Sequence, residues 1–234
     1  MKILIQTNEM QEIASKVSAA SFIKFGFKED DISFLDFKKN NLIQSYVGKK
    51  YLRNGKLKTF KNDLQSFTLL RFLGPEFLNY DGKALIIDPD VFAIKDPSNI
   101  IKLLDDGAGI ACSFYNGVAR SEVMLINCSK IQWNFEEILS DLFSLKIDYK
   151  DLMSLTFDKS LNIKELSKSY NSHDVINSDT ILLHTTNRIT QPWKEGLNID
   201  FERHISQKYK FKQYIKKIIG LKYNKKIFQN TYQR

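Results

Sequence analysis

Short apolar segments alternate with segments of helical periodicity along most of this chain, and this alternation constrains its fold more than any other feature. The polar, lysine-rich stretch 38–59 is interpreted as an irregular loop or an excursion from the main fold. Six segments have the length and apolar content typical of strands: residues 2–6, 32–37, 84–87, 109–114, 123–127 and 181–184. Strands that alternate with helices predict an α/β sandwich around a mostly parallel sheet.

Four helices are predicted between these strands. Thr7 and Asn8 open the first, in which Ile13, Val17 and Ala20 recur at helical spacing. The others are indicated by three signals: a capping box at residues 62–65, an Asp-Pro start at residues 96–97, and amphipathic periodicity over residues 133–143.

The net charge of +8 comes from the end of the chain. Residues 205–234 contain nine Lys or Arg and no acidic residue, which leaves 26 basic and 27 acidic residues in residues 1–204. We therefore expect one domain over residues 1–203 and a basic amphipathic tail over residues 204–234.

An apolar stripe runs through this tail at helical spacing, formed by Phe211, Tyr214, Ile215, Ile218 and Ile219. A basic amphipathic helix suits an anionic membrane surface. A stripe that packs on the body, or charges that bind nucleic acid, fit the same pattern. The body contains no RNA-recognition motif, KH loop or zinc finger, which makes nucleic acid the weakest of the three interpretations.

The sequence contains no signal-peptide pattern and no apolar run long enough to span a membrane. Cys112 and Cys128 lie in apolar surroundings, which is typical of buried free thiols in a reducing compartment. A P-loop, a complete dinucleotide fingerprint and a G-x-S-x-G elbow are all missing.

Asp88-Pro89-Asp90 is the sharpest local signal for chemistry. It follows the apolar strand 84–87, and side chains two residues apart in extended chain point to the same side. Ligands of open α/β sheets gather at the carboxyl ends of strands. Two carboxylates there can face one Mg²⁺ or Mn²⁺, which in turn holds phosphate oxygens. The simpler alternative is a polar turn that closes a strand.

His184 ends a second apolar strand and precedes a loop that carries Arg188 and Lys194. A histidine ligand beside two cations suits a bound diphosphate. The alternative is a hydrogen-bonded core histidine next to solvated cations.

Together these residues resemble the family-eight glycosyltransferases of the glycogenin and bacterial galactosyltransferase type. The resemblance rests on residues 67–76, on the strand and D-P-D motif over 82–91, on residues 122–127, and on the closing run from His184 to Pro192-Trp193. It is strongest to an uncharacterised bacterial branch with the motif LHTTxRxTQPWKTGLPxDF. It implies a GT-A fold, with a Rossmann-like mixed sheet, and a UDP-hexose donor held through Mn²⁺ or Mg²⁺.

The resemblance also implies roles for individual residues. Metal ligands would be Asp88, Asp90 and His184, and donor-binding residues would be Gln6, Thr7, Asn8, Arg71, Asp88, Asp90, Arg188 and Lys194. The family's D-Q-D-x-L-N stretch has its nearest match at residues 148–152, which makes Asp151 the candidate catalytic carboxylate; the alternative is a helix cap. Asn171 and Asp174 would face the acceptor; the alternative for both is an ordinary turn.

The expected function is therefore metal-dependent transfer of a hexose, with retention, to a glycan or lipid-linked acceptor. The expected location is the cytoplasm, at the inner face of a membrane. Two alternatives stay open: a protein that binds nucleic acid or another anionic polymer through its tail, and a degenerate transferase that only binds sugar nucleotides.

Overall fold

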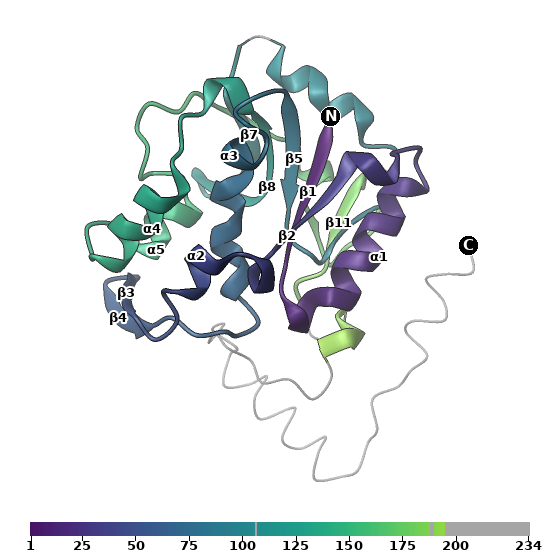
Figure 1. Cartoon of the computed structure of the whole chain (residues 1–234). Helices are drawn as coiled ribbons and strands as arrows, with labels where there is room; N and C mark the ends of the chain where they lie inside the picture. The colour runs from purple at the N-terminus through teal and green to yellow at the C-terminus, as the bar shows by residue number, and fades with distance from the viewer. Residues whose placement is uncertain (106, 188–189, 195–234) are drawn as a thin grey trace, which may run out of the picture. The chain divides into compact units, whose positions relative to one another are not determined.

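The computed structural model describes residues 1–105, 107–187 and 190–194. Its centre is a six-stranded sheet in the order β2-β1-β5-β8-β7-β9 (Figure 1). These strands are β2 (Ile32–Asp36), β1 (Lys2–Thr7), β5 (Lys83–Ile87), β8 (Val118–Asn127), β7 (Ile110–Tyr115) and β9 (Ile163–Glu165).

The sheet is mixed. β1 pairs in parallel with β2 and β5, whereas β8 runs antiparallel to β5 and β7, and β9 is parallel to β7. The carboxyl ends of β1 and β5 therefore lie at the same edge of the sheet. The middle of β8, around Val123, lies beside the end of β5.

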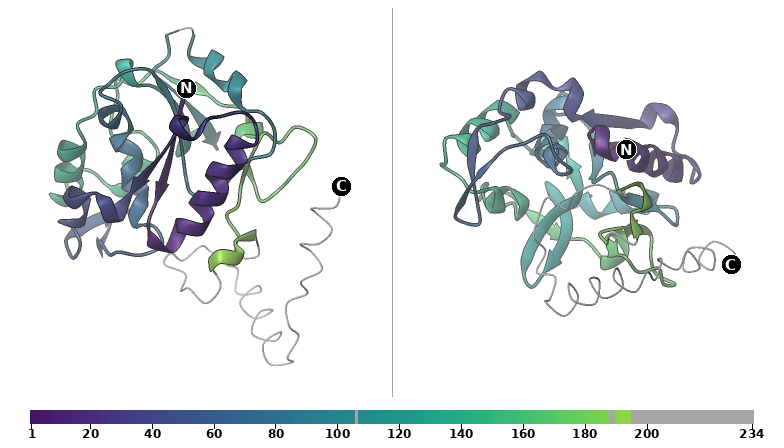
Figure 2. Two further views of the ribbon diagram at one scale, coloured as in Figure 1. Left: turned by 45° about the vertical axis from the view of Figure 1, so that its right-hand side comes forward. Right: turned by 90° about the horizontal axis from the view of Figure 1, so that it is seen from below.

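Successive side chains of the central strands point to opposite faces of the sheet, and each face has its own hydrophobic core. Leu4 and Ile86 point to one face, with the 3₁₀ segment η4 (Ser66–Leu73) and the helices α3 (Gly74–Phe77), α4 (Phe135–Phe143) and α5 (Tyr149–Met153). Ile3 and Leu85 point to the other face, with α1 (Glu12–Ile23) and the 3₁₀ segment η5 (Ser98–Leu104). Figure 2 shows these helices on either side of the sheet. The predicted α/β sandwich is confirmed.

Two smaller sheets complete the described fold. One has the order β10-β11-β6, formed by β10 (Ser172–His173), β11 (Leu182–His184) and β6 (Val91–Ala93). The other is the hairpin of β3 (Lys50–Arg53) and β4 (Lys56–Thr59). Further short elements are α2 (Asn41–Gln44), η1 (Glu9–Gln11), η2 (Glu29–Asp31), η3 (Phe37–Lys39), η6 (Cys128–Lys130), η7 (Lys168–Tyr170) and η9 (Pro192–Lys194).

The interpretation of residues 38–59 as a loop is wrong, because they contain α2 and the β3–β4 hairpin. Asn54 and Gly55 form the hairpin turn with φ angles of 54° and 71°. Asn-Gly supports this left-handed turn, which matches the twist of the paired strands. Tyr51 is buried in the main core, so this hairpin is anchored by packing as well as by its turn.

The helix predicted after Asn8 is present, but its apolar stripe faces outward. Ile13 and Val17 are 64% and 51% exposed. The buried face is made mostly of small residues and lies against β6, an edge strand. Ser18 Oγ donates to the carbonyl of Val91 at 2.5 Å, and Ser21 Oγ accepts from the amide of Ala93 at 2.9 Å. The helix therefore satisfies backbone groups that an edge strand leaves unpaired.

Cys112 and Cys128 are buried free thiols, as expected, and burial raises the pKa of each to about 11. Among the described residues, no helix combines the length and the apolar character needed to cross a membrane. The predicted boundary at residue 203 and the tail over residues 204–234 lie outside the described residues and stay predictions.

Candidate metal and donor-binding site

Strand register brings the first site residues together at the carboxyl edge of the sheet. Ile5 pairs with Ile87, so Gln6 and Asp88 follow side by side, and Gln6 Nε2 donates to Asp88 Oδ1 at 3.1 Å. The amide of Asp88 donates to the carbonyl of Glu122 at 3.1 Å, because β8 continues the pairing past Val123.

Arg71 lies beneath Asp88 and is 2% exposed. Its guanidinium donates to Asp88 Oδ1 at 2.7 Å, to Ser121 Oγ at 2.7 Å and to Gln6 Oε1 at 3.4 Å. Burial raises the pKa of Asp88 to about 6, and the opposing charge of Arg71 only partly offsets this effect. Arg71 therefore fixes the orientation of the Asp88 carboxylate.

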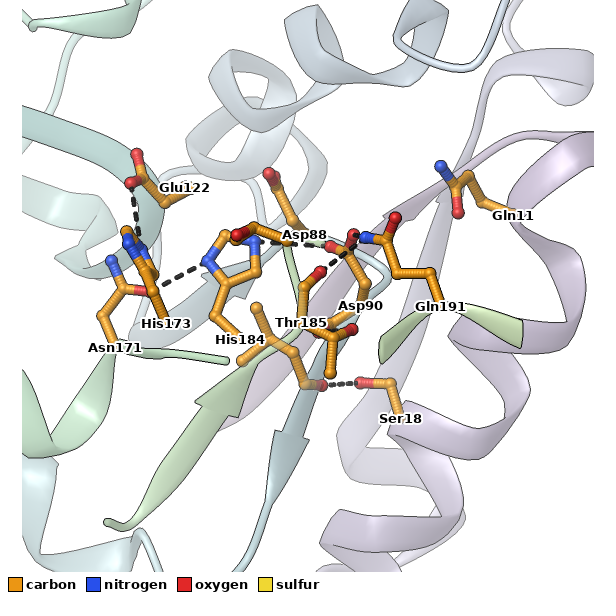
Figure 3. Close-up of polar contacts among 12 residues, drawn as sticks. Gln11, Ser18, Asp88, Asp90, Glu122, Asn171, His173, His184, Thr185 and Gln191 are labelled. Atoms are coloured by element: carbon orange, nitrogen blue, oxygen red, sulfur yellow. Dashed lines mark hydrogen bonds and ion pairs between the residues drawn. The ribbon is translucent and has the colours of Figure 1, made fainter. Parts of the chain in front are cut away.

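The pairing of β6 with β11 brings Asp90 to His184. Val91 is opposite His184, and the amide of Thr185 donates to the carbonyl of Asp90 at 3.0 Å. His184 Nε2 lies 3.4 Å from Asp90 Oδ1 (Figure 3). Burial acts to raise the pKa of Asp90, but the hydrogen bond and charge of His184, together with Lys194, outweigh it and lower this pKa.

Asp90 also holds the segment that follows β11. Gln191 Nε2 donates to Asp90 Oδ2 at 2.6 Å and to the carbonyl of Thr185 at 2.5 Å, and Lys194 Nζ lies 3.3 Å from Asp90 Oδ2. Trp193 Nε1 donates to Gln11 Oε1 at 3.3 Å, at the start of α1. The run from Gln191 to Lys194 is thus attached to the metal-ligand candidates and to the first helix.

The imidazole of His184 is oriented from behind by Asn171. Asn171 Nδ2 donates to Ser113 Oγ at 2.8 Å, so its Oδ1 faces His184 Nδ1 at 2.9 Å and accepts from it. A protonated ring thus donates from Nδ1 to Asn171 and from Nε2 to Asp90, whereas a neutral ring keeps its proton on Nδ1 and offers the lone pair of Nε2 to a metal. Such outer hydrogen bonds set the tautomer of metal-binding histidines.

The three predicted ligands fit a divalent cation. One ligand atom each from Asp88, Asp90 and His184 lies within 4.8 Å of the others. The described contacts of the Asp88 carboxylate go to Oδ1, which leaves Oδ2 for a metal. Two carboxylates and one imidazole suit Mn²⁺, and Mg²⁺ to a lesser degree.

A second polar group adjoins the first. His173 Nε2 lies 3.7 Å from Glu122 Oε1, and Arg120 Nε donates to the same oxygen at 3.2 Å. The rings of His173 and His184 meet edge to face with centroids 5.1 Å apart. The register of β7 and β8 shifts at Cys112/Ser113. This irregularity directs Ser121 toward Arg71 and Glu122 toward His173, which is a common use of bulges near active sites.

Other predicted residues make local structural contacts. Thr7 Oγ1 donates to Ser15 Oγ at 3.1 Å, and Asn8 caps η1 by accepting from the amide of Gln11. Asp151 accepts from the amide of Asp148 within the capping box of α5. Asp174 accepts from the amides of Thr186 and Asn187 and from the hydroxyls of Thr186 and Thr190.

These contacts leave the proposed substrate roles of Thr7, Asn8, Asp151, Asn171 and Asp174 as predictions. Arg188 lies outside the described residues, so its predicted contact with phosphate also stays a prediction.

Sequence reasoning missed four residues that the structure places at the site: Ser121, Glu122, His173 and Gln191. Glu122 and His173 are 51 positions apart, and neither lies in a recognisable ligand spacing. Gln191 could have been found, because it is the glutamine of the T-Q-P-W-K run that carries the family resemblance.

Solved structures share this fold. The galactosyltransferase LgtC, in complex with donor and acceptor sugar analogs, superposes with a TM-score of 0.52 at 14% identity over 80% of this chain and 88% of its own. The glycosyltransferase GlyE of Streptococcus pneumoniae TIGR4 gives 0.52 at 17% identity over 95% of this chain and 64% of its own. The bifunctional glycosyltransferase WbbM gives 0.52 at 10% identity over 80% of this chain and 46% of its own.

No protein-family model matches the sequence, and a search of curated proteins finds no similar sequence. The similarity to solved structures therefore establishes the fold: the chain has the GT-A fold of glycosyltransferases, as the sequence predicts.

Proposed function

We propose that this protein is a metal-dependent glycosyltransferase that moves a hexose, with retention, from a UDP-sugar to a glycan or lipid-linked acceptor. One observation carries the proposal. Asp88 and Asp90, two residues apart, converge with the sequence-distant His184 within 4.8 Å at the carboxyl edge of a GT-A sheet. LgtC, which has the same fold, was solved with donor and acceptor sugar analogs.

The surroundings of the three ligands suit a nucleotide diphosphate. Asp88, Asp90 and His184 would hold a divalent cation, whose positive charge would stabilise the leaving diphosphate. Lys194 adds a second positive charge beside Asp90. Arg71 and Gln6 hold Asp88, and Asn171 holds His184, so the ligand atoms are fixed before the donor arrives. Fixed groups of this kind lower the cost of reorganisation during the reaction.

A second candidate function is the binding of sugar nucleotides without transfer. It is favoured by Asp151, the nearest match to the family's catalytic carboxylate, whose Oδ2 is engaged in capping α5. The two functions predict the same binding but differ in turnover.

The test is a panel of UDP-glucose, UDP-galactose and UDP-N-acetylglucosamine, with Mn²⁺ or with EDTA. A ligand that binds only the folded protein, at 100 times its Kd, stabilises it by about 2.7 kcal/mol. We expect one UDP-sugar to raise the melting temperature only with Mn²⁺, and UDP release from that donor to follow. Binding without UDP release, even with added saccharide acceptors, would favour the second function. No Mn²⁺-dependent binding of any UDP-sugar or UDP would contradict both.

A further inference from the structure

Glu122 lies in the site but belongs to none of the roles described so far. Its side chain is 12% exposed, on the irregular part of β8, one residue beyond the Ser121 that holds Arg71. Its carboxylate contacts Arg120 and His173 and stands next to the three metal-ligand candidates.

The partners of Glu122 are accessible from outside. Arg120 and His173 contact the same carboxylate oxygen, Oε1, and their side chains are 47% and 45% exposed. The described contacts of the Glu122 side chain go to this one oxygen. Together the three residues place a carboxylate, a guanidinium and an imidazole side by side at a partly exposed part of the site.

The site has two ends. Figure 3 shows Gln191 and Gln11 on one side of His184, and Glu122 and His173 on the other. Lys194 joins the Gln191 side through Asp90. The ammonium group of Lys194, which suits a diphosphate, thus lies at one end of the site. A carboxylate that accepts hydrogen bonds from hydroxyl groups lies at the opposite end, immediately beyond His184.

We propose that Glu122, with Arg120 and His173, binds hydroxyl groups of the hexose carried by the nucleotide donor. The inference rests on the proposed function and adds a specificity-determining group to it. A ligand atom of Glu122 lies within 4.8 Å of one of His184, so a group bound there adjoins the metal-bound diphosphate, which is where the transferred sugar is attached. Charge-assisted hydrogen bonds from sugar hydroxyls to a partly buried carboxylate are strong and directional.

The same residues could instead hold a second cation, because Glu122, His173 and His184 also form a group of possible ligands. Two contacts favour the sugar. Arg120 already neutralises the Glu122 carboxylate, and the Nδ1 proton of His184 is committed to Asn171. A cation between these groups would be repelled by Arg120 and would find no lone pair on His184 Nδ1.

The experiment compares wild type, Glu122→Gln and the control Glu165→Gln, which removes an exposed carboxylate from β9. For each, Mn²⁺ stoichiometry and the Kd values of UDP and of the UDP-hexose panel are measured with Mn²⁺ by calorimetry. We expect Glu122→Gln to weaken the best UDP-hexose at least tenfold, with the Kd of UDP and the Mn²⁺ stoichiometry unchanged. Glu165→Gln should behave as wild type.

If Glu122→Gln does not fold, His173→Gln replaces it, because His173 is half-exposed; the same selective loss is expected. Equal losses for UDP and UDP-hexose, or a lost Mn²⁺ equivalent, would make Glu122 a metal ligand and overturn the proposal. Unchanged UDP-hexose affinity would overturn it as well. A wild-type protein that binds neither UDP nor any UDP-hexose would refute the proposed function and this inference with it, whereas a defect confined to the variant's hexose binding concerns Glu122 alone.

Discussion

Asn171 connects His184 to Ser113 on the main sheet and fixes which imidazole nitrogen faces the metal ligands. Loss of such an outer hydrogen bond typically costs 10–100-fold in metal affinity. We expect Asn171→Ala to weaken Mn²⁺ binding by about tenfold, with Asn171→Asp less affected because it can still accept from Nδ1. Isothermal titration with Mn²⁺ measures this, with the exposed Asn41→Ala as a control. An unchanged Mn²⁺ affinity in Asn171→Ala would show that Asn171 only contributes to packing and does not orient His184 for the metal.

Protons compete with the metal at two of the three ligands. Burial raises the pKa of Asp88 to about 6. Burial acts to lower the pKa of His184, but hydrogen bonding and charge from Asp90 outweigh it and raise this pKa. Both groups must lose a proton to bind a cation, so Mn²⁺ affinity should begin to fall as His184 is protonated, above its ordinary pKa, and fall further as the pH drops through about 6 and Asp88 is protonated. Below that point each displaced proton costs about tenfold per pH unit. An affinity that stays constant from pH 8 to pH 5 would exclude Asp88 as a ligand.

Individual ligands were predictable where a motif or a strand end marks them, as for Asp88, Asp90 and His184. Glu122 and His173 were not, because their meeting depends on an irregularity in β8 and on the pairing of β10 with β11. Contacts set by tertiary pairing leave no local signal in a single sequence.

At the scale of elements, the turn from η4 into α3 holds Arg71 over the sheet, and Gly74 makes this close approach possible. A Cβ at position 74 would lie 2.3 Å from Ile86 Cδ1. We expect Gly74→Ala to lower the free energy of unfolding by about 1–3 kcal/mol, the usual cost of overpacking. Urea unfolding measures this change.

Ile86→Val provides the matched test, because it removes the Cδ1 atom. The double variant Gly74→Ala/Ile86→Val should be more stable than the sum of the two single effects predicts. Strict additivity would show that the strain at position 74 does not come from Ile86.

Elements differed in how well the sequence predicted them. Five strands of the main sheet appear where apolar runs predict them, since buried strands need continuous apolar residues. The short strand β9 was not predicted, and the predicted strand 181–184 lies in the small sheet as β11. The buried face of α1 could not be predicted from periodicity, because Ser18 and Ser21 bond to β6 while Ile13 and Val17 remain outside. The β3–β4 hairpin was missed, although its Asn54-Gly55 turn was a usable signal.

At the scale of the whole molecule, the basic tail over residues 204–234 is a prediction from sequence. Each basic residue near an anionic membrane surface contributes about 1 kcal/mol. We expect the full chain to co-sediment with vesicles that contain anionic lipid, but not with neutral ones, and added salt to weaken the binding. A chain that ends at residue 203 should stay in the supernatant. If both chains sediment to the same extent, the tail does not bind the membrane and the prediction is wrong.

The central claim is that Asp88, Asp90 and His184 hold the metal that binds the donor diphosphate. Asp90→Asn tests it best, because replacing Asp88 would leave the buried Arg71 unpaired and cost about 3–5 kcal/mol of stability. The measurement is Mn²⁺ binding, followed by electron paramagnetic resonance with and without UDP, in wild type and Asp90→Asn. The account predicts one Mn²⁺ per wild-type chain, UDP binding that depends on it, and at least a hundredfold loss of both in the variant. A folded Asp90→Asn protein that binds Mn²⁺ and UDP as wild type does would contradict it.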